Sequence, residues 1–385
     1  MTVMAATRPP HTPLDTLLRA GPVLEIDLDR IAANYRALRR RYAGRILSAV
    51  VKNNGYGLGI AALVETLTAE GCTHFWVLDL AEAAMVKQAA PQAEVFTLHG
   101  LQGESAATFA ATDITPVLLS LDEVERCVAE ARRTGRKLGV AVQLDTGLGR
   151  LGLDEADIRR LAARRNQLEA LDVKAWVTHL AAFDLPDAES NRAQRECLRR
   201  WLRGLPAAPV SLASSAGLYM GPDWHFDIAR VGSALYGVQT STAWQDGLAV
   251  CYRLSAPILR INNAARGARI GYRGTTCLRR PSLIATAMIG YGNGLPQAFA
   301  AHGAARIGEC QLPVVGGIAM NLTMLDATDA PTACVQVGER AVFLDERHTV
   351  DQLAARLGCA PNAVLTQIGA GTRRIYVRNG LPAEV

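Results

Sequence analysis

Several kinds of segment are missing from this sequence, and each absence narrows the class of protein. No apolar run approaches the roughly 20 residues that a membrane-spanning helix needs, and the first residues, MTVMAATRPPHTP, hold no apolar stretch of signal-peptide length. The eight cysteines form no C-x-x-C pair, and none lies at metal-ligand spacing from a histidine, so we expect neither a disulfide framework nor a metal site. No basic stripe alternates with aromatic residues, which argues against nucleic acid as a partner. Together these absences predict a cytoplasmic protein with reduced thiols and no membrane segment.

The composition is that of a globular protein with a large core. The chain has 385 residues, of which 49% are apolar, and its net charge is only +5. This length exceeds one small domain and favours two domains, one of which could be a large barrel. The sequence contains no low-complexity linker and no repeat of fixed period.

The first part of the chain alternates between short apolar runs and helical patterns. VLEIDL (residues 23–28) is expected to be the first strand and RILSAVV (residues 45–51) the second, and similar runs recur to about residue 240. Strands that alternate with helices predict a parallel α/β sheet, and about eight such units favour a closed (β/α)₈ TIM-type barrel. We therefore assign residues 13–245 to a barrel and residues 1–12 to a loose N-terminal tail.

The pattern changes after about residue 245. Strand-like runs such as AVCYRLSAPILRI and RAVFLD are separated by Gly/Pro turns, and TVDQLAARLGC (residues 349–359) is the one segment with helical periodicity. Residues 246–385 are therefore predicted to form a mainly β C-terminal domain, so that the fold class is an α/β barrel followed by a β domain.

Polar residues follow several of the predicted barrel strands at the point where each strand ends. In a (β/α)₈ barrel the carboxyl ends of the strands meet at the active-site face. We therefore expect one shared pocket that holds an amine, a histidine, two guanidiniums and hydroxyl groups. The residues concerned are Lys52, Asp145, Arg150, His179, Ser214, Ser215 and Arg230.

Lys52 stands in the stretch AVVKNNGYGLG, directly after two valines. A lysine at a barrel mouth is either a surface residue or a nucleophile whose pKa is lowered by burial and nearby cations. The glycines at positions 55, 57 and 59 surround Tyr56 and let the backbone approach a ligand closely. The segment lacks the spacing of a P-loop. The pattern alone leaves both interpretations of Lys52 open.

Eight ordered motifs add to this pattern. They are AVVKNNGYGLG, LDTGLGRLG, THLAAFD, ASSAG, RVGSALYG, IGYGNG, GGIAMN and RRIYV. In this order they resemble the motifs of the alanine racemases, the fold type III pyridoxal-phosphate enzymes, from about Pro22 to Val377. The resemblance implies a barrel followed by a β domain, which agrees with the domain boundary inferred from the pattern.

The resemblance also implies a cofactor, pyridoxal 5'-phosphate, and the residues that bind it. Lys52 matches the lysine that bonds covalently to the cofactor. Arg230 matches the arginine that faces the pyridine nitrogen, and His179 is its neighbour. The phosphate-binding groups match Tyr56, Ser215, Gly232, Ser233 and Tyr376.

The implied reaction is the interconversion of L- and D-alanine, an isomerase activity that needs one base on each face of the substrate. Lys52 and Tyr291 match these two bases, and both have ordinary pKa values of about 10 that must be lowered for work near neutrality. Arg150 and Met320 match the groups that bind the substrate carboxylate. Because Tyr291 and Met320 act in the neighbouring subunit's pocket in that family, a homodimer is implied. Without the resemblance, Tyr291 would be interpreted as an ordinary strand-end aromatic residue and His179 as a core histidine.

Four positions depart from the family pattern. Gln143 stands where many members have a carbamylated lysine. It can accept a hydrogen bond from Arg150 but brings no negative charge, so we expect that arginine to be held less strongly. The other departures are Asn293 and Asn321, each in place of an aspartate, and Gly317 in place of an arginine whose expected partner, Asp184, is retained. One interpretation is drift among working alanine racemases. The other is a racemase, an epimerase or another fold type III enzyme acting on a different amino acid, with a larger one as one case.

A third hypothesis belongs to another class of protein. A pyridoxal-phosphate carrier or regulator without turnover would bind the cofactor in the same kind of barrel. Proteins of that kind lack the β domain that supplies Tyr291 and Met320, so the presence of residues 246–385 argues against it.

Overall fold

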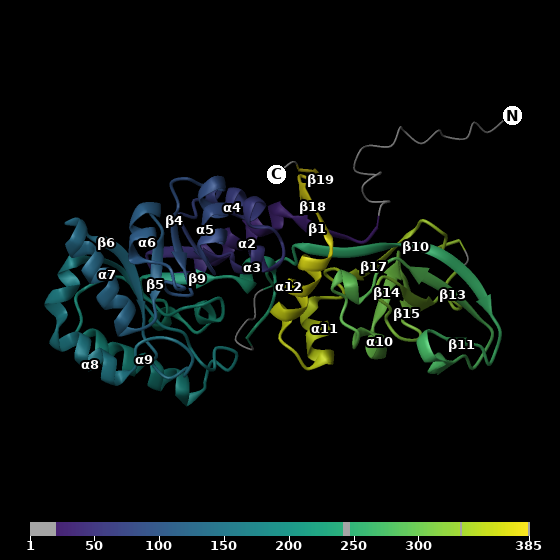
Figure 1. The fold of residues 1–385 in the computed structure, drawn as a ribbon. Helices are drawn as coiled ribbons and strands as arrows, with labels where there is room; N and C mark the ends of the chain where they lie inside the picture. Colours follow the sequence, from purple (N-terminus) through teal and green to yellow (C-terminus); the bar gives the residue numbers. More distant parts are fainter. Residues whose placement is uncertain (1–20, 242–246, 332, 384–385) are drawn as a thin grey trace. The chain divides into compact units, whose positions relative to one another are not determined.

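The computed structural model describes residues 21–241, 247–331 and 333–383. The chain separates into two compact units (Figure 1): one runs from Leu28 to Cys251, and the other joins the strand ending at Asp27 to the residues from Tyr252 onward. The predicted N-terminal tail, residues 1–12, lies outside the described residues. So does residue 246, where the second domain was expected to begin.

The first unit is built on an eight-stranded parallel sheet, in the order β8-β7-β6-β5-β4-β3-β2-β9. The two end strands also meet, since Arg230 N–H donates to Ala213 O at 2.9 Å and Asp227 N–H donates to Val210 O at 3.0 Å. The sheet therefore closes on itself, and the prediction of a TIM-type barrel is confirmed. The strands are β2 (Ile46–Val50), β3 (His74–Val77), β4 (Glu94–Thr97), β5 (Thr115–Leu118), β6 (Leu138–Gln143), β7 (Leu171–Val177), β8 (Val210–Ser211) and β9 (Ile228–Val231).

Helices surround these strands (Figure 1). Several begin at an Asp or Ser whose side chain accepts the backbone N–H three residues later, as Asp79 does for Glu82 and Ser120 does for Glu123. The helices of this unit are α2 (Leu28–Arg41), α4 (Ile60–Ala69), α5 (Leu80–Ala89), α6 (Ala106–Thr112), α7 (Leu121–Thr134), α8 (Glu155–Ala163) and α9 (Glu189–Leu202). The same unit also contains short 3-10 helices, η1 (Arg165–Ala170), η2 (Ala216–Tyr219), η3 (Pro222–Trp224) and η4 (Ser233–Tyr236). Among the described residues, every helix is too short or too polar to cross a membrane.

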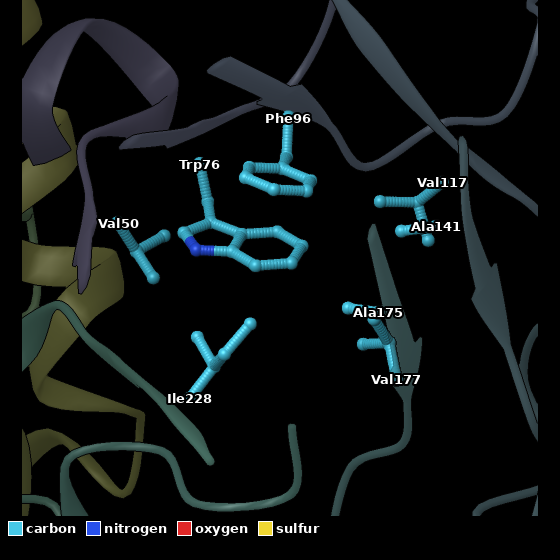
Figure 2. Packing of buried hydrophobic residues seen from close by; sticks show 8 residues of the cluster. All are labelled: Val50, Trp76, Phe96, Val117, Ala141, Ala175, Val177 and Ile228. Carbon is cyan, nitrogen blue, oxygen red and sulfur yellow. The ribbon is translucent and has the colours of Figure 1, made fainter. Parts of the chain in front are cut away.

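The barrel interior is a packed core (Figure 2). Trp76 and Phe96 stack with ring centroids 4.2 Å apart and planes within 14° of parallel. Small side chains from β6 and β7 complete the same cluster, so that large and small residues together fill the space. The cluster consists of Val50, Trp76, Phe96, Val117, Ala141, Ala175, Val177 and Ile228. Because the interior is filled, a ligand site can lie only at an end of the barrel.

The second unit contains a nine-stranded sheet and a separate two-stranded ribbon. The sheet consists of β1 (Val23–Asp27), β10 (Tyr252–Ala264), β13 (Ser282–Ala287), β14 (Ala304–Ile307), β15 (Cys310–Pro313), β16 (Thr323–Asp326), β17 (Arg340–Leu344), β18 (Arg373–Arg378) and β19 (Leu381–Pro382). The ribbon pairs β11 (Arg269–Ile270) with β12 (Thr276–Cys277). The prediction of a mainly β C-terminal domain is confirmed.

Strand β1 differs from the prediction, which placed VLEIDL and the rest of residues 13–27 in the barrel. Val23 pairs with Ser255 of β10 in antiparallel fashion and with Arg373 of β18 in parallel fashion, so β1 is an inner strand of the β unit. The first barrel strand is therefore β2, not β1. The apolar pattern identified a strand correctly, but it carries no information about which of two sheets the strand joins.

The helix expected at residues 349–359 is present as α11 (Val350–Leu357). Thr349 accepts the Gln352 N–H, and the Gln352 side chain accepts the Thr349 N–H, which makes a capping box. The expectation that this was the one helix is wrong, because α12 (Pro361–Gly371) and the short α10 (Phe299–His302) also form. Helix α12 was missed because its buried face is short and ends in a glycine, Gly369, although proline stands in its first turn.

Candidate active site

Lys52 follows strand β2, after Val51, and is the first residue of an unusual segment. The next four residues, Asn53 to Tyr56, all have left-handed backbone conformations, with φ of 54°, 50°, 65° and 58°. Only Gly55 among them adopts this region without steric cost. We call residues 52–56, labelled α3, the lysine turn. Three non-glycine residues in strained geometry are typical of functional sites, where the surrounding structure must hold the strain.

Tyr56, at the end of the lysine turn, lies against the loop that follows β9. Its ring packs on Tyr236 at 5.1 Å between centroids. A Cβ atom at Gly232 would lie 2.4 Å from the Tyr56 hydroxyl, so only glycine allows this approach. Burial raises the pKa of Tyr56 to about 12, and its hydroxyl therefore remains a hydrogen-bond donor at neutral pH.

Ser215 lies beside the same loop after β9. Its hydroxyl oxygen accepts the backbone N–H of Gly232 at 3.0 Å and of Ala234 at 3.2 Å. Ser233 lies between these two residues, and its hydroxyl is 3.3 Å from that of Thr240. Four of the residues predicted to bind a phosphate, Tyr56, Ser215, Gly232 and Ser233, are thus brought together.

Arg230 is buried in the barrel, with 7% of its surface exposed. Nη1 donates to Ser211 O at 2.9 Å and to Ser211 Oγ at 2.6 Å, and Nη2 donates to Thr178 O at 2.6 Å. Its guanidinium also lies 5.5 Å from the centre of the Trp76 ring, in cation–π contact. Burial and the charge of Arg150 lower the pKa of Arg230 to about 10, so it remains a cation held by neutral groups.

These charges act on two further predicted residues. Burial, and then Arg150 and Arg230, lower the pKa of the Lys52 amine, while Glu82 opposes them. Burial and the charges of Arg230, Arg150 and Lys52 lower the pKa of His179 to about 3, so this histidine is neutral at physiological pH. The half-buried amine thus meets the first requirement of a covalent or basic lysine.

Arg150 extends from a loop whose shape is set by Asp145. Asp145 Oδ1 accepts the N–H groups of Gly147, Leu148 and Gly149 at 3.1, 2.9 and 3.0 Å, which leaves Arg150 exposed at the end of the turn. Among the described residues, the Arg150 guanidinium donates no hydrogen bond to the Gln143 side chain.

Tyr291 and Met320 meet within the β unit. Tyr291 N–H donates to Ala319 O at 3.0 Å, and Gly292 N–H donates to Met320 O at 2.7 Å. Gly290 is required here, because a Cβ would lie 2.0 Å from Ala319 O. Both side chains face solvent in the single chain, with 38% of Tyr291 and 57% of Met320 exposed. Tyr376 lies in β18 of the same unit. The positions of these three residues relative to Lys52 remain predictions.

Sequence reasoning missed the residues that support the site. Ser211 and Thr178 anchor Arg230, and Glu82 accepts the Asn54 N–H of the lysine turn at 2.8 Å. A serine inside a buried two-residue strand such as β8 is a signal that could have been used, because a buried hydroxyl needs a partner. No comparable signal distinguishes Glu82 from other acidic residues in a first helical turn.

Comparisons of both domains and of the whole chain with known proteins identify the same family. Residues 26–240 match the family described as "Alanine racemase, N-terminal domain", and residues 251–376 match "Alanine racemase, C-terminal domain". The chain is 36% identical to the alanine racemase of Acidiphilium cryptum, over 92% of this chain and 98% of that one. It is 34% identical to that of Brucella ovis over 94% of each.

A solved structure gives the same result. The alanine racemase of Bartonella henselae with covalently bound pyridoxal phosphate superposes with a TM-score of 0.89 at 32% identity, covering 93% of this chain and all of that one. The resemblance inferred from the eight motifs is therefore confirmed. Since both domains match and the identity extends over nearly the whole of each chain, this chain belongs to the alanine racemase family.

Proposed function

We propose that this chain is a pyridoxal-phosphate-dependent racemase that interconverts L- and D-alanine. The observation that carries the proposal is the Lys52 amine, placed at the end of a barrel strand with its pKa lowered by burial, Arg150 and Arg230. Membership of the family supports the activity, and the covalently bound cofactor of the Bartonella henselae relative supports the cofactor.

The barrel residues fit this cofactor. A covalent bond to an aldehyde needs a lysine that can lose its proton, and Lys52 is such a lysine. A phosphate dianion needs hydroxyl and amide donors, and Tyr56, Ser215 and Ser233 gather around Gly232, whose missing side chain lets the Tyr56 hydroxyl approach. When bound, the cofactor withdraws electrons from the substrate Cα and makes its proton acidic.

The remaining work belongs to the protein's own residues. We assign Lys52 and Tyr291 as the two groups that remove and return the Cα proton, one on each face. Arg230 would hold the pyridine nitrogen and would offer it a cation and not a carboxylic acid. Carbonyl and hydroxyl oxygens of Ser211 and Thr178 fix the position of this guanidinium. His179 is neutral beside it. Arg150 and the backbone of Met320 bind the substrate carboxylate, and Tyr376 contributes to the phosphate site.

The same assignment implies a homodimer. Tyr291 and Met320 would act in the partner subunit's pocket, and their exposure in the single chain supports a surface that another copy covers. Tyr272 and Leu259, 80% and 46% exposed, add apolar surface to the same unit. We also propose a cytoplasmic location, which the eight free cysteines support.

A larger substrate is the second candidate, and Gly317 is the observation that favours it. A Cβ added at Gly317 would meet no atom within 4 Å, so the position expected to hold an arginine is open space. The third hypothesis, a carrier without turnover, has less support, because the β unit is present and holds Tyr291 against the Met320 segment.

The experiment is exchange at Cα with chiral analysis of the product. The purified protein is incubated with pyridoxal phosphate and L-alanine in deuterated water, alongside a panel of larger L-amino acids. We expect deuterium at Cα and formation of D-alanine, and Lys52→Ala should abolish both together with the visible absorbance of the lysine-linked cofactor. Exchange confined to a larger amino acid would favour the second candidate, and cofactor binding without any exchange would favour the third.

A further inference from the structure

One carboxylate connects two loops at the active-site end of the barrel. Glu82 lies in the first turn of α5, where its own N–H donates to Asp79 Oδ1 at 2.9 Å. Glu82 Oε2 accepts the N–H of Leu78, just after β3, at 2.9 Å. Glu82 Oε1 accepts the N–H of Asn54 at 2.8 Å. The side chain therefore ties the end of β3 to the middle of the lysine turn with two charge-assisted hydrogen bonds.

The lysine turn needs such an anchor. Its four left-handed residues carry a conformational cost that local hydrogen bonds must offset. Three of those bonds are internal: Gly55 N–H to Val51 O at 2.7 Å, Gly57 N–H to Asn53 O at 2.9 Å and Gly59 N–H to Asn54 O at 2.8 Å. Asn54 stands at the centre, because its Oδ1 also accepts the first N–H of α4, from Ile60, at 2.9 Å. Asn54 N–H donates to Glu82, so the centre of the turn is joined to α5 as well as to α4.

We propose that Glu82 is a positioning residue for Lys52 and Tyr56, holding the lysine turn in the left-handed conformation that aims the amine and the phenol at the cofactor. This inference rests on the proposed function for its account of what the two side chains do. The hydrogen bonds that carry it are independent of that function.

The charge of Glu82 has a second consequence. The groups that act on the Lys52 amine are Arg150 after β6, Arg230 in β9 and Glu82 in α5, and Lys52 in turn acts on His179 after β7. Glu82 is the one anion among them, and it raises the pKa that the two arginines lower. It therefore balances the cations around the amine as well as fixing the turn.

The barrel provides a matched control in Glu123. This residue lies in the first turn of α7, where its N–H donates to Ser120 Oγ at 3.3 Å. Its Oε2 accepts the N–H of Leu119 after β5 at 2.6 Å, and its Oε1 accepts the N–H of Leu101 in the loop after β4 at 3.0 Å. The geometry is the same, but the loop that Glu123 anchors carries none of the predicted site residues. Glu82→Gln and Glu123→Gln therefore remove the same charge, and one of the two acceptor oxygens, at two places in the barrel.

The test compares these two variants with the wild-type holoenzyme. Thermal unfolding measures the structural loss, hydrogen–deuterium exchange measures the backbone, and absorbance with borohydride trapping measures the cofactor bound to Lys52. Both variants should unfold a few degrees lower. Faster amide exchange is expected at residues 52–59 in Glu82→Gln and at residues 98–105 in Glu123→Gln. Only Glu82→Gln should weaken cofactor binding, by tenfold or more, and reduce kcat by a similar factor.

Equal effects of the two substitutions on cofactor binding and on kcat would overturn the proposal, because Glu82 would then be merely structural. Unchanged exchange at residues 52–59 in Glu82→Gln would also overturn it. Should that variant fail to fold, Glu82→Asp keeps the charge but is too short for both donors, and an intermediate effect is expected. If the wild type neither binds pyridoxal phosphate nor racemises, the proposed function fails, and the exchange comparison still decides whether Glu82 holds the turn.

Discussion

Asn321 donates its side-chain amide to Asn293 Oδ1 at 3.3 Å, and the same oxygen accepts the Gly290 N–H at 3.2 Å. These asparagines are two of the four departures from the family pattern. The contact makes them one feature and not two independent changes. Because Asn293 closes the short turn that carries Tyr291, the neutral amide pair fixes the backbone on either side of the predicted base.

The direction of this hydrogen bond predicts unequal effects of two similar substitutions. Asn293→Asp keeps an acceptor for both donors and should change the free energy of unfolding by less than about 0.5 kcal/mol. Asn321→Asp removes the donor and places a carboxylate against Asn293 Oδ1 at the surface, which should cost about 0.5–1 kcal/mol. Urea unfolding of the two single variants measures the difference. Equal losses would mean that the amide pair is not oriented as described.

Much of the barrel site could be predicted because it depends on residue type at strand ends. Lys52, His179 and Arg230 follow or end apolar runs, and parallel strands must bring their carboxyl ends together. That argument needs only periodicity. It gave an amine, a histidine and a guanidinium in one place, and their mutual effects on pKa agree with it.

The features that were missed depend on long-range pairing and on backbone conformation. The sheet that β1 joins is decided by β10 and β18, which lie more than two hundred residues later in the chain. The left-handed run from Asn53 to Tyr56 contains only one glycine, so its residue types do not reveal it. The assignments of Tyr291 and Met320 came from the resemblance alone, because an exposed tyrosine and methionine carry no chemical signal by themselves.

The close approach of Tyr56 to Gly232 predicts that a side chain at position 232 is destabilising and that a second substitution, at Tyr56, relieves the clash. Gly232→Ala places a methyl group 2.4 Å from the Tyr56 hydroxyl and 2.9 Å from its ring, and the displacement should cost about 1–3 kcal/mol of stability and weaken cofactor binding. Tyr56→Phe removes the nearer atom. The double variant should therefore be more stable than the sum of the single effects predicts, by about 0.5 kcal/mol or more. Strict additivity in a thermal or urea unfolding cycle would contradict the contact.

His179 predicts part of the acid sensitivity of the protein. The pKa of His179 is about 3 in the folded chain and near 6.5 in the unfolded chain. As the pH is lowered below 6.5, the unfolded state binds a proton that the folded state does not, and the free energy of unfolding decreases. Between pH 6.5 and 5 this group should cost about 1–2 kcal/mol. His179→Gln should flatten that part of the profile. His74, His225 and His348 also have lowered pKa values, but they contribute equally to the pH profiles of the wild type and of His179→Gln. Parallel stability profiles from urea unfolding at each pH would contradict the assignment.

Tyr291 predicts an asymmetry between the two directions of the reaction. If Lys52 serves one face of the substrate and Tyr291 the other, Tyr291→Phe should retain the lysine-linked cofactor and exchange the Cα proton of one enantiomer at close to the normal rate. Exchange of the other enantiomer, which we expect to be L-alanine, should fall by about 10²- to 10⁴-fold. Tyr219→Phe makes the same chemical change at a barrel tyrosine that stacks under Arg41 and is not among the predicted site residues, and it should leave both rates unchanged. Deuterium incorporation into each enantiomer, followed separately, gives the two rates. Normal exchange of both enantiomers by Tyr291→Phe would show that another group returns the proton on that face.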